Sequence, residues 1–220
     1  MRVGHGWIFG LVVSAGLAML DVAVAANVET VPGKITLQAE YFDKDSNLLN
    51  DASLPRIVLF RMPIIAGNLA GEVTSPDLVQ LKIKVGEPTI LDLEEIITTV
   101  ESSAASVTKE AAKAGLVVTP KEARFARFVT LVAYPETGKG VGGARFQTTE
   151  GNQTILLVYF DRPCQLSGVA HARGGSISYD VHVASRGIHL LMAVRDEQSN
   201  VRVTNASVPA VLVLRITPHK

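Results

Sequence analysis

The chain has 220 residues, with 21 Lys and Arg against 21 Asp and Glu, so its formal net charge is zero. A neutral chain without a Lys/Arg run offers no general electrostatic attraction to nucleic acid or anionic lipid, and we expect no nucleic-acid partner. Apolar residues make up 47% of the chain and charged residues 19%, a composition that excludes disorder over most of its length.

The N-terminus has the three parts of a secretory signal peptide. Arg2 precedes an apolar run from Trp7 to Leu20, and a stretch of small residues follows from Val22 to Ala26. Cleavage after Ala25 is predicted, which places the protein in the periplasm or outside the cell. The alternative, a membrane anchor, needs about 20 apolar residues, and the run ends earlier, at Asp21. We therefore expect no stable membrane insertion after cleavage.

The first elements expected after the signal peptide are strands. Apolar and polar residues alternate from Lys34 to Asp43 and from Leu78 to Val85, the period of a half-buried strand. Between them, Arg56 to Arg61 is a short apolar run bounded by prolines. A turn at Gly86-Glu87-Pro88 ends this group.

The hydrophobic period then changes to that of a helix, over Asp92 to Ala114. Its apolar residues recur at steps of three and four: Leu93, Ile96, Ile97, Val100, Ala104, Val107, Ala111 and Ala114. Asp92 with Glu95 is a capping-box variant, and Gly115 suits the helix end. Poor helix formers from Ser102 to Ser106 favour the alternative of two shorter helices. We expect the apolar stripe to pack on a sheet.

Beyond Pro120 the pattern returns to strands. The candidates are Phe125–Tyr134, Thr154–Asp161, Ser176–Ala184, Ile188–Val194 and Val208–Ile216. The glycine-rich segment Gly138–Gly143 lacks the spacing of a phosphate-binding P-loop, and we interpret it as a hairpin loop. The stretch Thr137–Ala144 resembles the turn of prealbumin-like sandwich modules, a resemblance that implies no function.

The predicted fold is mainly β, an antiparallel β-sandwich of Ig-like or prealbumin-like type with one helical insertion. Residues 1–25 are the predicted signal peptide and residues 26–220 the mature domain. That length suffices for one large domain or two small ones. In the second case, β-units at 26–90 and 120–220 are joined by the helical segment 92–114.

Cys164 is the only cysteine, so the chain forms no internal disulfide and depends on packing for its stability. We interpret it as a small buried side chain that stays reduced. A disulfide to a second chain is the alternative. No base lies nearby in sequence to activate the thiol as a nucleophile.

The strongest candidate for chemistry is a histidine group in the C-terminal half. Asp180 and His182 alternate along one expected strand and so share a face. A two-residue turn after this strand would place His189 opposite His182 with Cβ atoms about 5 Å apart, and His171 could approach from the preceding loop. Such a group binds divalent transition metals. A three-residue turn would put the two imidazoles on opposite faces and leave only a solvated polar face.

Other motifs that carry chemistry do not occur. The sequence has no Gly-x-Ser-x-Gly serine elbow, no zinc-protease helix motif and no paired-cysteine zinc site. Asn152 and Asn205 match the N-glycosylation pattern, which matters only in a eukaryotic host.

These patterns favour an exported, non-catalytic protein without a cofactor, which binds another envelope or extracellular protein or supports an envelope assembly. The second hypothesis is a metal-binding protein or metalloenzyme that uses the histidine group and a divalent transition metal. The third is a carrier of a small apolar ligand held between sheet and helix.

Overall fold

The computed structural model describes residues 33–69, 78–128, 132–136, 139–149, 153–172 and 175–219. The predicted signal peptide, residues 1–25, lies outside these ranges, as do Asn152 and Gly138. Within them the fold is mainly β, as predicted, with fourteen strands and two helices.

The elements follow one another along the chain as follows. Four strands precede the helices: β1 (Lys34–Tyr41), β2 (Ile57–Ala66), β3 (Leu78–Lys84) and β4 (Pro88–Asp92). The helices are α1 (Leu93–Ser103) and α2 (Lys109–Lys113). The remaining strands are β5 (Val117–Thr119), β6 (Phe125–Phe128), β7 (Val132–Pro135), β8 (Gly142–Gln147), β9 (Thr154–Phe160), β10 (Cys164–Ala172), β11 (Gly175–Val183), β12 (Gly187–Arg195), β13 (Val201–Asn205) and β14 (Leu212–Pro218).

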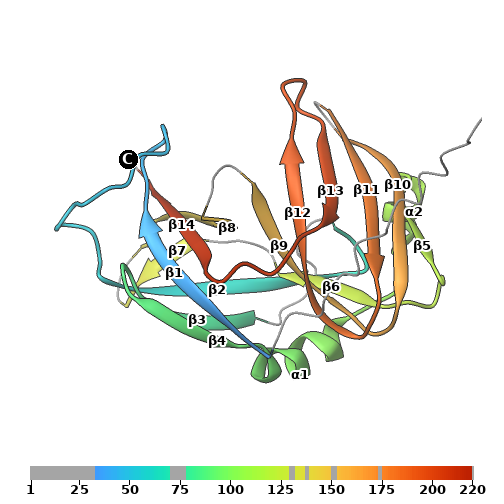
Figure 1. Ribbon diagram of the computed structural model, residues 1–220, viewed down its shortest axis with the longest axis horizontal. Coiled ribbons are helices and arrows are strands. Elements are labelled where there is room, and N and C mark those ends of the chain that lie inside the picture. The colour runs from blue at the N-terminus through green and yellow to red at the C-terminus, as the bar shows by residue number, and fades with distance from the viewer. Residues whose placement is uncertain are drawn as a thin grey trace, which may run out of the picture.

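Strand pairing closes a ring of five strands, in the order β8–β7–β2–β6–β9 and back to β8. Two wings extend from this ring. The N-terminal wing continues from β8 through β14 and β1 to β4, and the C-terminal wing continues from β9 through β12, β13, β11 and β10 to β5. β3 pairs with β2 outside this path. The long strand β2 runs between the two wings, which stand toward its opposite ends (Figure 1).

The sheet is mixed, and the expectation of a purely antiparallel sheet is wrong. β1 pairs with β14 in parallel, with Leu37 opposite Leu212, and β11 pairs with β13 in parallel, with Tyr179 opposite Val203. The parallel pairs arise because β14, the last strand, lies beside β1, the first, and because β13 lies between β11 and β12. An Ig-like or prealbumin-like sandwich is not confirmed.

Buried side chains form two hydrophobic cores. Core 1 joins the N-terminal wing, the ring and α1, and its fully buried members include Leu37, Val58, Ile64, Val100 and Ile216. Core 2 lies in the C-terminal wing beneath α2, and its fully buried members include Phe125, Val158, Phe160, Leu166 and Val181. Strands β6, β9 and β12 contribute to both cores, because successive side chains of a strand point to opposite faces.

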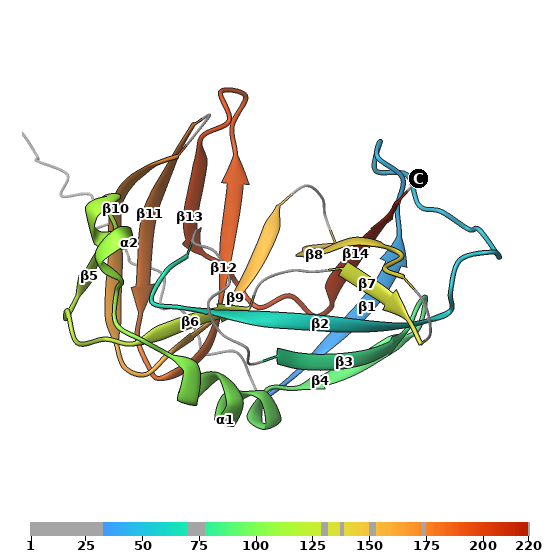
Figure 2. The same ribbon diagram turned by 180° about the vertical axis from the view of Figure 1, so that it is seen from behind.

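The predicted helical segment forms two helices, which confirms the two-helix alternative. α1 begins after Asp92, whose carboxylate accepts a hydrogen bond from the backbone N–H of Glu94 at 3.1 Å. Its buried residues belong to the predicted stripe: Leu93, Ile96 and Val100. α2 begins after Thr108 and ends before Gly115, which has the φ of +107° that favours glycine. α1 lies below the ring and α2 lies at the far edge of the C-terminal wing (Figure 2). Neither of these described helices has the length and apolar content that a membrane crossing requires.

Each strand predicted from the hydrophobic pattern is present, with the stretch Phe125–Tyr134 divided into β6 and β7. The pattern missed β4, β5, β8, β10 and β13. Part of β8 was assigned to a glycine-rich loop, but Gly142 is required within the strand. A Cβ atom there would lie 2.1 Å from the carbonyl oxygen of Thr217 on β14, so the two strands approach as only glycine permits. In β10, Gly168 at φ +108° interrupts the alternation that would have identified a strand.

Candidate functional site

Most of the histidine group lies on the outer face of the C-terminal wing. We define the outer face as the side chains of β10–β13 that point away from core 2: Gln165, Ser167, Val169 and His171 of β10, Ser176, Ser178, Asp180 and His182 of β11, Met192 and Val194 of β12, and Arg202 and Thr204 of β13. The intervening residues Tyr179, Val181 and Val183 are buried in core 2. This is the alternation that placed Asp180 and His182 on one face.

Asp180 is the centre of a small charged group on the outer face. Its carboxylate lies 3.5 Å from Nε2 of His182 and 3.7 Å from Nη2 of Arg202. All three side chains are more than half exposed, at 58% for Asp180, 52% for His182 and 69% for Arg202. Because water screens charges at such exposure, these contacts contribute little to stability and leave the side chains free to meet a partner.

The hairpin on which the metal hypothesis depended is not formed. β13 lies between β11 and β12, so His182 has no partner position on β12. β12 instead pairs with β9 and β13, and His189 stands opposite Val158 of β9. The turn that follows β11 therefore carries the chain past the position of β13 before β12 begins. Local sequence does not encode this path.

His189 lies inside the protein, away from the outer face. Its side chain is fully buried, its Nε2 is 2.9 Å from the carbonyl oxygen of Ser185, and its ring meets that of Phe160 edge-on at 5.7 Å. Burial lowers the pKa of His189 below its ordinary value, and the hydrogen bond to Ser185 opposes this only in part. The imidazole is therefore neutral and serves as part of core 2.

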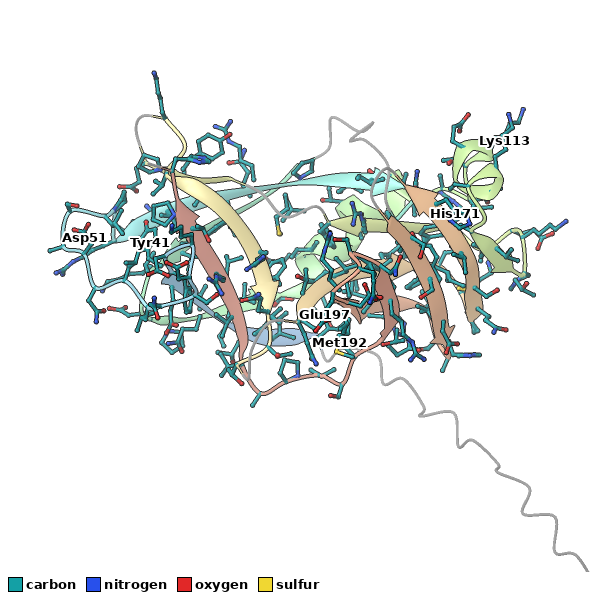
Figure 3. The ribbon with its side chains drawn as sticks, turned by 90° about the horizontal axis from the view of Figure 1, so that it is seen from above. Tyr41, Asp51, Lys113, His171, Met192 and Glu197 are labelled. Atoms are coloured by element: carbon teal, nitrogen blue, oxygen red, sulfur yellow. The ribbon has the colours of Figure 1, made fainter. Side chains whose placement is uncertain are left out.

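His171 lies on β10 at the edge near α2, far from Met192 (Figure 3). It is four residues along β10 from Ser167, the register partner of Asp180, which corresponds to about 13 Å along the strand. The structure thus brings Asp180 and His182 together and leaves His171 and His189 elsewhere. In the described ranges, no three His, Cys, Asp or Glu side chains lie close enough together to hold a metal ion.

Two asparagines hold β13 in its place beside β11. Oδ1 of Asn200 accepts hydrogen bonds from the backbone N–H of Ser176 at 3.1 Å and from its hydroxyl at 2.9 Å. At the other end of β13, Asn205 accepts from the backbone N–H of His182 at 2.9 Å and donates to its carbonyl oxygen at 3.1 Å. These amides extend the parallel ladder at both ends, which satisfies backbone groups that would otherwise be unpaired.

A groove of about 640 Å³ hollows the outer face along β12 and β13. Its lining combines the apolar side chains of Met192, Val194 and Val201 with the polar side chains of Ser178, Asp196, Asn200, Arg202 and Thr204. Val194 is 40% exposed, and Val169, on β10 of the same face, is 46% exposed. The sequence analysis missed this groove because β13, which forms one side of it, was not predicted as a strand.

Cys164 begins β10 as a buried thiol, which confirms the predicted burial. Burial, assisted by the nearby negative charge of Asp161, raises the pKa of Cys164 to about 12. The thiol is therefore protonated at neutral pH, a state unsuited to nucleophilic attack.

Comparison of the chain with known proteins adds no relative. No protein-family model, no curated protein and no solved structure matches it.

Proposed function

We propose that this chain is an exported, non-catalytic binding protein whose C-terminal wing holds a macromolecular partner on its outer face. The observation that carries this proposal is the groove along β12 and β13, where the exposed Val194 and the half-buried Met192 form an apolar floor. An exposed sheet face is usually polar, so apolar side chains on it indicate a surface that is covered part of the time.

The surroundings of the floor support binding of a protein surface. Arg202, Asp180 and Thr204 supply charges and hydrogen-bonding groups at its border, and protein interfaces combine an apolar centre with such a polar rim. The exposed Arg202 is the best anchor among them, since its planar guanidinium can pair with a carboxylate of the partner. The partner that fits is another envelope or extracellular protein with an apolar side chain beside an acidic one.

The test is photo-crosslinking in living cells that produce the full chain. A photoreactive amino acid at Val194 should give a discrete adduct with a second protein, and Arg202→Glu in the same chain should reduce that adduct several-fold. Thr98, which is exposed on α1, is the matched control position and should give no discrete adduct. Equal labelling from both positions, or no adduct from Val194, would contradict the proposal.

Export is tested separately by sequencing the N-terminus of the protein recovered outside the cytoplasm. The proposal requires a start at or close to Ala26. A chain that retains Met1 and stays with the membrane fraction would show that the protein is anchored and not released.

A further inference from the structure

A second pocket, of about 380 Å³, lies in the N-terminal wing, far along the sheet from the outer face. It is formed where the loop after β1 folds over strands β8 and β14. Its lining residues are Asp43, Lys44, Gly143, Ala144, Arg145, Arg215 and Thr217. Three of these side chains carry a positive charge, on a chain whose formal net charge is zero.

Arg215 is buried beneath this pocket to an extent that is rare for arginine. Only 4% of the residue is exposed, and its guanidinium lies 4.6 Å from the centre of the Phe42 ring. Nη2 donates a hydrogen bond to the backbone carbonyl oxygen of Asp43 at 3.1 Å, while Nε has no hydrogen-bond partner among the described residues. Desolvation and the charge of Arg145 both lower the pKa of Arg215, so the surroundings do not fully compensate its charge.

The carboxylates nearby are engaged elsewhere. Asp43 accepts hydrogen bonds from the backbone N–H groups of Asp45 and Asn47, both at 2.8 Å, and from Nδ2 of Asn47 at 2.9 Å. Glu40 is the register partner of Arg215 on β1, but its carboxylate accepts from Nε2 of Gln38 at 2.6 Å and does not line the pocket.

Asp43 is the one carboxylate in the lining, and its negative charge offsets those of the three cations only in part. Arg145 stands directly opposite Arg215 on the neighbouring strand. In the part of the chain that the structure describes, neither these arginines nor Lys44 form an ion pair. A buried charge that its surroundings offset only in part is costly, and two arginines side by side repel each other, so the arrangement favours an anion between them.

We propose that this pocket binds a phosphate group. Guanidinium groups match the oxygens of phosphate with paired hydrogen bonds, and Lys44 adds a mobile positive charge at the rim. The pocket has room for the phosphate beside Gly143, because a Cβ atom added to Gly143 would meet nothing within 4 Å. The phosphate comes either from solution or from the headgroup of an envelope lipid, and both sources present the same oxygens to Arg145 and Arg215.

Calorimetric titration of the mature protein with inorganic phosphate, against sodium chloride of equal ionic strength, tests the pocket. Phosphate should bind saturably where chloride does not. Arg145→Gln removes an exposed cation, and Gly143→Leu fills the open space, so each should weaken binding at least tenfold without unfolding the protein. Arg195→Gln, at the exposed end of β12 in the other wing, is the matched control and should bind as the unchanged protein does.

The proposal is overturned if phosphate gives no more heat than chloride, or if Arg195→Gln weakens binding as much as Arg145→Gln does. Thermal unfolding of each variant without phosphate separates a lost site from a lost fold, and Lys44→Gln provides a second exposed variant for that comparison.

Sedimentation with vesicles of phosphatidylcholine containing a minority of phosphatidic acid identifies the source. Binding that inorganic phosphate displaces and that Arg145→Gln abolishes assigns the site to a lipid headgroup. Phosphate binding without vesicle binding assigns it to a soluble phosphate. Vesicle binding that Arg145→Gln leaves unchanged would contradict the pocket as the lipid site.

Discussion

At the scale of single residues, Cys164 is a thiol that packing keeps unreactive. Because burial raises its pKa to about 12, almost none of it is thiolate at pH 8. We expect an aromatic disulfide reagent to label the native protein slowly at pH 8 and to label one thiol per chain rapidly in denaturant. Rapid labelling of the native protein, or a dimer that reducing agent dissociates, would contradict this prediction and support a disulfide to a second chain.

His189 should make the fold sensitive to acid. Burial lowers its pKa in the folded protein below the ordinary value of about 6.5, so the unfolded chain takes up a proton at a higher pH than the folded chain does. The stability that neutral His189 contributes is complete above about pH 6.5 and is lost as the pH falls below that value. Urea unfolding between pH 7.5 and 5 should show this loss.

The matched variants are His189→Gln and His182→Gln. Glutamine at 189 carries no proton to titrate and can still donate to Ser185, so this variant should show a smaller loss of stability between pH 7 and pH 5. His182→Gln removes a ring exposed on the outer face and should retain the loss seen in the unchanged protein. Identical pH profiles for all three proteins would show that His189 is not the responsible group.

At the scale of elements, α1 packs against the ring and against one strand of each wing. Its buried face contacts β1, β2, β6, β9 and β12. At its C-terminal end, the carbonyl oxygen of Ala104 accepts from Nε of Arg124 at 2.9 Å, a cation placed where the helix dipole is negative. Both oxygens of Glu101 accept from Nη2 of Arg186 at 2.7 Å, which connects the helix to the turn before β12.

Val100→Asp should therefore destabilise the protein strongly. Val100 is fully buried in core 1, and a carboxylate placed there has no partner, which should lower the free energy of unfolding by roughly 3 kcal/mol or more. The control is Thr98→Asp, since Thr98 lies on the exposed side of the same helix and the change should have a small effect. Chemical denaturation measures both. Equal stability of the two variants would mean that the stripe is exposed and available for docking.

The elements that the hydrophobic pattern predicted are those whose two sides differ in polarity. β1 and α1 each bury one side only, so a period of two or of three to four is visible in the sequence. β8 and β10 were missed because glycine replaces the side chains that would show the period. β13 is five residues long and lies between Asn200, which precedes it, and Asn205, its last residue. Both asparagines resemble turn residues until their hydrogen bonds to β11 are seen.

At the scale of the whole molecule, the closed ring of strands should make the two cores unfold together. β9 places Leu157 in core 1 and the adjacent Val158 in core 2, so neither core can open without disturbing the other. Leu166→Ala, in core 2, and Leu37→Ala, in core 1, should each cost about 2–5 kcal/mol and should each lower one common transition in calorimetry. Two separate transitions, with each variant shifting only its own, would show that the wings are independent domains.

Local periodicity by itself determined that this protein is mainly β with a helical segment near the middle. The poor helix formers from Ser102 to Ser106 indicated that this segment could divide in two, and residue type alone indicated that Cys164 is buried. Periodicity also placed Asp180 and His182 on one face, because alternation along a single strand requires no knowledge of its neighbours. The tertiary structure alone decided which strands are adjacent. It put β13 between β11 and β12, buried His189 and opened the groove beside Val194. It also placed Arg145 opposite Arg215. Such pairings join residues far apart in the chain, and their free energy depends on the packing of the whole sheet, which no local pattern contains.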